Sequence, residues 1–332
     1  MGRVAKRVLH HSGLLGLARL ARSHARGVVL RYHALTDSTA PVVHAAPDIC
    51  MPVDAFRRQM AFVKRAYTVM PLDELVDAVA GGGKLPVRPL AITFDDGYAD
   101  NHRLGLPVLR ELGLPATVYV ATGAIADAAP FWVAAVRALA LGVAHALPMP
   151  DGPAQPVDGA ASRTAAAKAL TRELVPMAAE ARAAWLADTA RATGVDVVGT
   201  LAGTMLDWAQ IRELATAGWT IGAHTVTHSN VALIEPARAE REIAESRDAL
   251  AAAIGAPVRH FCYPNSGGQH AYFGPAVSAI LKKLDFRSAT TSRPGALAPG
   301  ADPFLLPRLG VSPRLADVPE LATAMERQRL AA

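Results

Sequence analysis

Two adjacent carboxylates follow an apolar run in the first third of the chain. Asp95 and Asp96 come directly after residues 90–94 and before Gly97, which permits a sharp turn. Strands of parallel α/β folds end at the face that carries the active site, and a turn there would let both carboxylates reach one cleft. Two close carboxylates stay ionised at low cost only beside a cation. The pair indicates a cation site, with aspartates that cap a helix beginning near Asn101 as the simpler alternative.

Two histidines four residues apart follow another apolar run. His224 and His228 come after residues 219–223, and their imidazoles face the same side if the segment turns helically. Neutral imidazole is a ligand for Zn, Fe, Ni or Co. The spacing alone is equally consistent with a surface or core pair. Together with one of the two carboxylates it supplies three ligands and leaves positions open for water and substrate, as catalytic metal sites do.

The elements that must position these residues alternate along the chain. Strands are predicted at 28–32, 67–70, 90–94, 116–121, 219–223, 259–263 and 286–290, with another at 306–311. Helices are predicted between most of them, at 54–65, 72–79, 101–112, 207–217, 236–254 and 275–284. This alternation predicts parallel βα units, hence a barrel or an open doubly wound sheet. Pro236 is expected in the first turn of its helix and Asp54 at an N-cap.

One region interrupts the alternation. Between residues 126 and 203 no strand is predicted, whereas 131–143 and 162–193 have helical patterns on either side of a proline- and glycine-rich segment. We interpret 126–203 as a helical insertion between two βα units and not as an independent domain, and we expect it to cover or lengthen one rim of the cleft. The chain is then divided into a basic segment at 1–27, a main domain at 28–315 and a C-terminal helix or tail at 316–332.

Composition excludes several classes of protein. With 51% hydrophobic and 19% charged residues, the 332-residue chain has an ordinary globular composition and ample core. Cys50 and Cys262 offer neither a disulfide framework nor a thiolate metal cluster. The net charge of +5 arises in the first 26 residues, which hold six of the 34 basic residues and none of the 29 acidic ones. The remainder is nearly neutral, so no nucleic-acid partner is indicated.

The basic N-terminal segment lacks the features of a clear export signal. Its apolar stretch is interrupted by His10, His11 and Arg19, and no run reaches the roughly 18 apolar residues of a membrane span. We interpret it as a partly amphipathic helix that packs on the domain or stays mobile. A weak contact with a membrane surface and an export signal are the alternatives. We expect a cytoplasmic protein, with membrane association as the alternative.

The two metal motifs together resemble the polysaccharide deacetylase family, also called the NodB-homology or carbohydrate esterase 4 family. They read Thr93-Phe-Asp95-Asp96-Gly97 and His224-Thr-Val-Thr-His228. Members linked to exopolysaccharide synthesis carry further motifs in corresponding order, which here read Arg31-Tyr32-His33, Phe261-Cys-Tyr263-Pro264-Asn265 and Leu306-Pro-Arg308. The resemblance covers roughly residues 28 to 312.

The resemblance implies a fold, an ion and a reaction. The fold is a distorted (β/α)7 barrel, and the ion is one divalent metal, zinc first with cobalt, nickel or iron as alternatives. The reaction is hydrolysis of an N-acetyl, or sometimes O-acetyl, group on an amino-sugar glycan or glycan precursor in exopolysaccharide or cell-envelope metabolism. By motif position Asp95 is the catalytic base, and Asp96, His224 and His228 bind the metal. The ion would lower the pKa of a water towards about 7, and Asp95 would accept its proton.

Substrate contacts are assigned to four residues near these motifs. The backbone N–H of Tyr98 is expected to help bind the oxyanion. Tyr263, Pro264 and Asn265 follow a predicted strand and are expected near the substrate. For Tyr263 the alternative is a place in the core or cleft wall.

The sequence departs from the family pattern in two places. Cys262 stands where the family often has an arginine that orients the base, and no histidine follows His270 to serve as the usual late general acid. We predict that Arg308 pairs with Asp95, orients it and lowers its pKa. We also predict that His33 gives a proton to the leaving amine. The alternatives are a surface ion pair for Arg308 and an orienting hydrogen bond for His33.

Two other functions remain open from the sequence. One is hydrolysis of a small non-sugar amide on the same barrel. The other is a non-catalytic carbohydrate-binding protein with a structural metal, which the intact Asp95 argues against because a structural site needs no uncoordinated carboxylate. Whether the cleft is an open groove or a closed pocket would distinguish a polymer from a small substrate.

Overall fold

A computed structural model describes residues 26–40, 42–80, 85–264 and 271–330 of the chain. The basic segment predicted at 1–27 therefore falls almost wholly outside the described residues, and so does Asn265. Among the helices that are described, none combines the length and the apolar composition needed to cross a bilayer.

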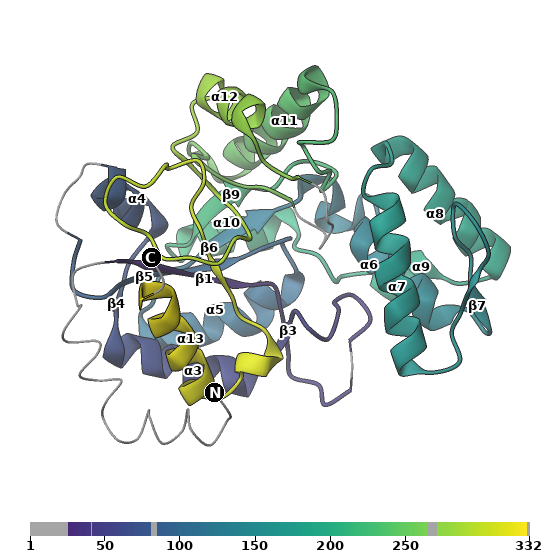
Figure 1. The fold of residues 1–332 in the computed structure, drawn as a ribbon, viewed down its shortest axis with the longest axis horizontal. Helices are drawn as coiled ribbons and strands as arrows, with labels where there is room; N and C mark the ends of the chain where they lie inside the picture. Colours follow the sequence, from purple (N-terminus) through teal and green to yellow (C-terminus); the bar gives the residue numbers. More distant parts are fainter. Residues whose placement is uncertain (1–25, 41, 81–84, 265–270, 331–332) are drawn as a thin grey trace.

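Strands β2 Ala34–Thr36 and β3 Cys50–Pro52 pair with each other in a separate two-stranded sheet, which was not predicted from the sequence. Eight other described strands of the main domain form one parallel sheet (Figure 1). They are β1 Val28–Tyr32, β4 Thr68–Val69, β5 Pro89–Phe94, β6 Thr117–Val120, β9 Thr220–Ala223, β10 His260–Cys262, β11 Ser288–Thr290 and β12 Leu309–Gly310. The order is β11-β10-β9-β6-β5-β1-β12, and β4 pairs with the first residues of β5. Each predicted strand overlaps one of these strands, so the alternating pattern located every strand of this sheet.

The sheet curls until its two edge strands are linked by one segment. The Leu306 N–H donates to the carbonyl of Ala289 in β11, while a few residues later the Val311 N–H donates to the carbonyl of Arg31 in β1. Residues 303–311, which include the edge strand β12, thus run beside β1 and also beside β11 at the other edge. The fold is the predicted distorted (β/α)7 barrel, and its strands deliver their carboxyl ends to one face.

Helices cover the outside of the barrel (Figure 1). They are α3 Val53–Ala66, α4 Leu72–Ala80, α5 Leu106–Leu112, α10 Trp208–Thr216, α11 Pro236–Ile254 and α12 Pro275–Lys283. Pro236 begins α11 as predicted. The N-cap prediction for Asp54 is wrong: Pro52 holds that position, and Asp54 lies in the first turn, where its charge favours the helix dipole. Helix α13, Val318–Leu330, packs against the barrel with Leu321 and Met325 fully buried.

The insertion lies beside the barrel (Figure 1). It contains α6 Trp132–Gly142, α7 Ala160–Leu174, α8 Ala179–Thr193 and α9 Val197–Leu201. A hairpin of two short strands, β7 Ala146–Leu147 and β8 Gln155–Pro156, was not predicted from the sequence. The single helix predicted at 162–193 is two helices, α7 and α8, because Pro176 between them lacks the N–H that a continuous helix needs. Leu139 and Leu170 of the insertion share one buried cluster with Tyr98 and Ala121 of the barrel. The insertion and the barrel are therefore joined by a common core.

Candidate active site

The turn after β5 brings both carboxylates to one side. Successive residues of a strand point to opposite faces, but Asp96 has φ 74° and Gly97 has φ 86°, so the chain leaves the strand in a left-handed turn. A side chain on Gly97 would also place its Cβ 2.9 Å from Val120 Cγ1. A non-glycine residue at positive φ costs on the order of 1–3 kcal/mol, and such strain concentrates at functional sites. The turn predicted at the end of this strand is present.

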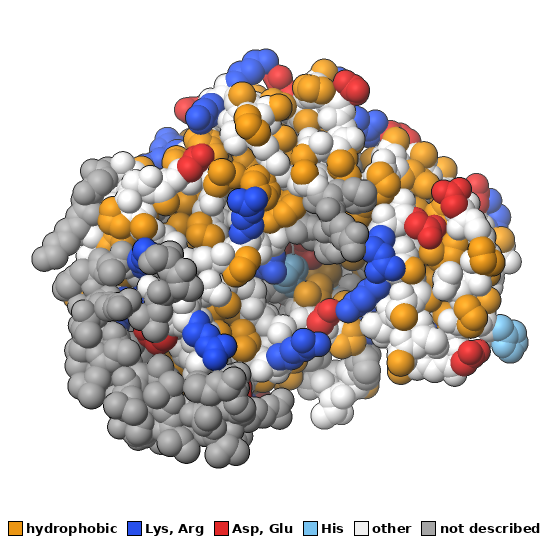
Figure 2. Space-filling model, in the orientation of Figure 1, with side chains coloured by type: hydrophobic (Ala, Val, Ile, Leu, Met, Phe, Trp, Pro, Cys, Tyr) orange, Lys and Arg blue, Asp and Glu red, His pale blue; other side chains and the backbone are white. Residues whose placement is uncertain are grey.

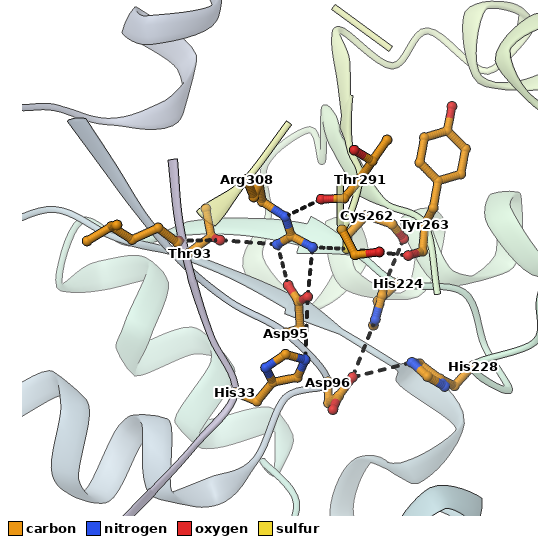
Figure 3. A network of polar contacts seen from close by, with 12 residues as sticks. His33, Thr93, Asp95, Asp96, His224, His228, Cys262, Tyr263, Thr291 and Arg308 are labelled. Carbon is orange, nitrogen blue, oxygen red and sulfur yellow. Dashed lines mark hydrogen bonds and ion pairs between the residues drawn. The ribbon is translucent and has the colours of Figure 1, made fainter. Parts of the chain in front are cut away.

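Three buried side chains form a ligand set of the right size for a metal ion (Figure 3). Asp96 Oδ1 lies 3.4 Å from His224 Nε2 and 3.3 Å from His228 Nε2. Ligand atoms about 2.0–2.2 Å from one ion in a near-tetrahedral arrangement are about 3.3–3.6 Å apart. The spacing therefore fits one ion bound by one carboxylate and two imidazoles.

The hydrogen bond of His224 supports the same conclusion. Its Nδ1 lies 2.7 Å from the carbonyl oxygen of Cys262 and so carries a proton that it donates. In the neutral ring Nε2 is then a lone-pair acceptor that faces the acceptor oxygen of Asp96. Two such atoms attract each other only through a metal ion or a proton between them. An imidazole whose outer nitrogen donates to a carbonyl is the usual arrangement of a metal-binding histidine.

The second carboxylate forms a buried ion pair. Arg308 Nη1 donates to Asp95 Oδ1 at 2.6 Å and Nη2 to Oδ2 at 2.8 Å (Figure 3). The predicted contact between Arg308 and Asp95 is therefore present. Because Arg308 is only 1% exposed, the alternative of a surface ion pair is wrong. Burial alone would raise the pKa of Asp95, but the charge and hydrogen bonds of Arg308 outweigh it and hold that pKa at about 2. Asp95 is therefore ionised at every pH at which the protein would work.

Asp95 also lies near a different set of possible ligands, with His224 and Cys262. Both of its oxygens accept hydrogen bonds from Arg308, however, and a cation beside that guanidinium would be repelled. Asp96 carries no such competitor. The geometry therefore favours Asp96 as the ligand and leaves Asp95 uncoordinated.

One cavity of about 490 Å³ is lined by all three ligands and by His33, Asp95 and Arg308. Figure 2 shows this face hollowed, with a histidine visible inside and basic side chains along the rim. Val133 of α6 and Lys168, Thr171 and Arg172 of α7 form part of the wall, so the insertion contributes to the rim as predicted. A larger hollow of about 680 Å³ between α6, α8 and α9 is lined mainly by apolar side chains.

Comparisons with known proteins agree with this geometry. The family model described as polysaccharide deacetylase matches residues 82–289, which is more than half of the chain. The chain belongs to the polysaccharide deacetylase family. It is accordingly a hydrolase of the class that acts on carbon–nitrogen bonds. A search of curated proteins found no match.

Solved structures share the fold of this family member at low sequence identity. The deacetylase PplD of Streptococcus pyogenes, in complex with acetate, is 18% identical with a TM-score of 0.61, over 91% of this chain and 99% of that one. IcaB from Ammonifex degensii is 20% identical with a TM-score of 0.58, over 92% and 98%. The deacetylase domain of BpsB from Bordetella bronchiseptica is 17% identical with a TM-score of 0.51, over 86% and 96%.

This polysaccharide deacetylase family member orients its Asp–Arg pair with residues from several strands. Arg308 Nε donates to the carbonyl of Thr291 at 2.9 Å, and Nη1 donates to Thr93 Oγ1 at 3.1 Å. Arg308 Nη2 also lies 3.0 Å from Cys262 Sγ. The small Cys262, at the position where the family often has an arginine, leaves room for a guanidinium that comes from the segment running beside β11.

His33 faces the same cavity. It follows β1, and its Nε2 lies 3.9 Å from Asp95 Oδ2. Its carbonyl accepts a hydrogen bond from the Asn101 side chain at 2.7 Å. Asn101 begins a π-helical turn, Asn101–Gly105, where the sequence predicted an α-helix throughout. Burial lowers the pKa of His33 to about 4, and Asp96 and Asp95 offset that only in part. The ring is therefore neutral near pH 7 and has no proton to give until it has received one.

The structure does not place the side chains of Tyr98 and Tyr263 where they would contact a substrate near the metal ligands. The Tyr98 ring is fully buried and packs against Phe131, so its side chain does not line the cavity. The Tyr263 hydroxyl donates to the carbonyl of Phe304 at 3.0 Å, which points the ring away from the ligands (Figure 3). Tyr263 is nevertheless among the residues that line the cavity, so it is a buried part of the cleft wall, in agreement with the alternative of a core or wall position. Pro264 is buried, and Asn265 lies outside the described residues.

The segment that carries the two histidines is not helical, which corrects the expectation from their spacing. Thr225 has φ 65° and His228 has φ 52°. Glu242 of α11 holds this loop: its carboxylate accepts from the N–H groups of Val226 and Thr227, at 3.0 and 2.9 Å, and from the Thr227 hydroxyl at 2.7 Å. No local pattern marks Glu242, and the sequence analysis missed it.

A buried arginine supports the same loop from the insertion. Arg182 of α8 is 2% exposed, and its Nη2 donates to the carbonyl of Thr227 at 3.1 Å. Its guanidinium also lies 4.4 Å from the centre of the Trp132 ring. The loop between the histidines is thus fixed by the barrel on one side and by the insertion on the other.

Replacing His224 by alanine is expected to abolish stoichiometric metal binding, because it removes one of three ligands from a site that has no spare donor in the set. Elemental analysis of purified wild type and His224→Ala, each loaded with zinc and desalted, measures this. Equal metal content in both would overturn the assignment of the ligands.

Glu242→Gln is expected to weaken metal binding by about 10-fold, the lower end of the effect of losing a residue that orients a metal ligand, because Glu242 holds the loop between the two histidine ligands. The amide can accept at one oxygen but not at two, so one side of the loop loses its anchor. A competition titration with a chromophoric chelator measures the affinity. Glu245→Gln, on the same helix and exposed, is the matched control and should leave the affinity unchanged.

A Ser–His–Asp arrangement at the other end of the barrel is not a second site. His260 bonds Asp73 at 2.6 Å and Ser288 at 2.8 Å through its two ring nitrogens. Both His260 and Ser288 begin their strands, at the ends that face away from the cavity. Ser288 is fully buried, so its hydroxyl is inaccessible to a substrate.

Proposed function

We propose that the protein removes N-acetyl groups from an amino-sugar saccharide with one divalent ion, zinc in the first instance, held by Asp96, His224 and His228. One observation carries the proposal. A complete three-ligand set and an uncoordinated carboxylate, fixed by a bidentate arginine, line the same cavity. A site that only binds metal for stability needs the first of these and has no use for the second.

Each residue of the site has a separate proposed role. A divalent ion bound by the three ligands would lower the pKa of a water and polarise the acetyl carbonyl. Asp95 accepts the proton of the attacking water, and Arg308 keeps the carboxylate aimed at it. His33 is neutral at the start, so it takes up this proton before passing it to the leaving amine. The Tyr98 N–H, which lies in the turn after the two aspartates, remains the proposed donor to the oxyanion.

The size of the cavity bears on the substrate. About 490 Å³ falls in the range of pockets that enclose a small ligand. We infer that the protein acts on a short saccharide or on the end of a glycan, and not along an extended polymer. The PplD structure was solved with acetate, the product expected of deacetylation. This likeness supports the proposal without deciding the sugar.

Acetate release tests the proposal. Zinc-loaded protein should release acetate from tri-N-acetylchitotriose, and the metal-free protein should not, with recovery when zinc is returned. A parallel assay uses N-acetylated amines that are not sugars. Release only from the latter would make the protein a small-molecule amidase. Tight zinc binding without release from any substrate would make it a carbohydrate-binding relative with a structural metal.

A further inference from the structure

The charges that line the cavity do not cancel. Its fixed cations outnumber its carboxylates by four to three: Arg31, Lys168, Arg172 and Arg308 against Asp48, Asp95 and Asp96. Arg308 is paired with Asp95, and Lys168 Nζ lies 3.0 Å from Asp48 Oδ2. Asp96 belongs to the metal ligands. Two cations, Arg31 and Arg172, are left without a carboxylate partner among the described residues.

Arg31 is held in the wall of the cavity by the geometry of β1. It lies two residues before His33, and residues two apart on a strand share a face. Opposite it in β12 is Gly310, and a Cβ at that position would lie 2.8 Å from Arg31 Nη2. The absence of a side chain at Gly310 therefore makes room for the guanidinium.

Arg31 is also incompletely satisfied. Its Nε is buried without a hydrogen-bond partner among the described residues. Burial, and after it the charge of Arg308, lower the pKa of Arg31. A buried guanidinium normally has an acceptor, and leaving it unpaired is costly. An anion in the cavity would supply the hydrogen-bond acceptor that Arg31 lacks among the described residues.

Arg172 lines the same cavity from the insertion. It lies in the last turn of α7 and is exposed. An anion within the cavity can thus meet a guanidinium from the barrel and another from the insertion. Guanidinium forks match the oxygens of carboxylates and phosphates, with which they form two parallel hydrogen bonds.

We propose that the acylated sugar carries an anionic group, a carboxylate or a phosphate, which Arg31 and Arg172 bind in the metal cavity. The inference rests on the proposed deacetylation and narrows its substrate class. A neutral N-acetylated saccharide would leave both guanidinium groups without an anionic partner. The insertion then has a specific task, because it brings Arg172 and Lys168 to the rim of a barrel that already holds the metal ligands.

A matched set of substrates tests the proposal on the zinc-loaded full chain. The set is tri-N-acetylchitotriose, the same trisaccharide oxidised to a carboxylate at one C6, and the same trisaccharide with a phosphate at that C6. One of the anionic substrates is expected to exceed the neutral one in kcat/KM by about 10-fold or more, as a charge-assisted hydrogen bond provides. The two anionic substrates distinguish a carboxylate from a phosphate as the group that is recognised.

Variants assign the preference to the two arginines. Arg172→Gln and Arg31→Gln should each lower the ratio of anionic to neutral kcat/KM by about 10-fold. Arg172 is exposed, so its variant should fold even if Arg31→Gln does not. Arg58→Gln, an exposed arginine of α3 away from the cavity, should leave the ratio unchanged. Equal rates on all three substrates, or a ratio that both variants leave intact, would overturn the proposal.

Calorimetric binding of the same saccharides separates this inference from the proposed function. If none of them releases acetate but an anionic one binds at least about 10-fold more tightly to wild type than to Arg172→Gln, the deacetylase proposal fails and the anion site stands. If the neutral substrate is deacetylated as well as the anionic ones and binds equally, the anion site fails and the deacetylase proposal stands.

Discussion

Asp95→Asn is expected to lower turnover by about 10²- to 10⁴-fold, the usual contribution of a general base, while the metal content stays that of wild type. The amide is nearly isosteric with the carboxylate but cannot accept the proton of a water. Both Asp95 oxygens face Arg308 and neither belongs to the three-ligand set, so the metal should remain. Acetate release and elemental analysis of one preparation measure both properties.

Asp96→Ala is the matched comparison, because the two aspartates are adjacent but have different partners. It should lose the metal and the activity together. If Asp95→Asn loses metal as completely as Asp96→Ala, the roles of base and ligand have been assigned wrongly. The distinction matters because Asp95, His224 and Cys262 also lie close enough together to hold an ion.

Local patterns were sufficient to predict the sheet and most of the site. Asp95, Asp96, His224 and His33 all directly follow strands that apolar runs identify, and parallel strands of a barrel end at one face. Predicting the contact between Arg308 and Asp95 required one further inference, namely that the apolar run at 306–311 closes the barrel beside β1. The structure has that closure.

Residues that act through tertiary contacts could not be predicted in this way. Glu242 holds the loop between the histidines from a helix that begins eight residues after His228, and nothing in the pattern of that helix marks one glutamate above another. The helical expectation for the histidine pair was wrong for the same reason. The left-handed residues Thr225 and His228 are compatible with no helix, and contacts from α8 and α11 hold them there.

The second large effect is on stability and concerns Arg308. Arg308→Met would leave the Asp95 carboxylate buried without its partner, which is expected to lower the free energy of unfolding by roughly 3–5 kcal/mol. Arg308→Lys keeps the charge but loses the two-pronged contact, so it should impair turnover with a smaller loss of stability. Urea unfolding at pH 7 and the acetate-release assay measure the two effects.

The pH dependence of this loss follows from the direction of the pKa shift. In wild type the pKa of Asp95 is lowered to about 2, so its contribution to stability is present above its ordinary value near 4 and is lost as the pH falls through about 2. In Arg308→Met only burial acts strongly, and it raises the pKa of Asp95. The difference in stability between wild type and variant should therefore shrink as the pH is lowered from 7 towards 3. A difference that does not change with pH would place the effect of the substitution elsewhere.

The double variant Arg308→Met, Asp95→Asn shows whether the lost stability belongs to the pair. Removing one partner of a buried ion pair exposes the other to the full cost of desolvation, whereas replacing both can be nearly neutral. The double variant is therefore expected to be more stable than Arg308→Met alone, although it lacks one more native side chain, and to be inactive because the base is gone. If it is no more stable than the single variant, Arg308 stabilises the barrel through its contacts with Thr93 and Thr291, and its pairing with Asp95 serves orientation alone.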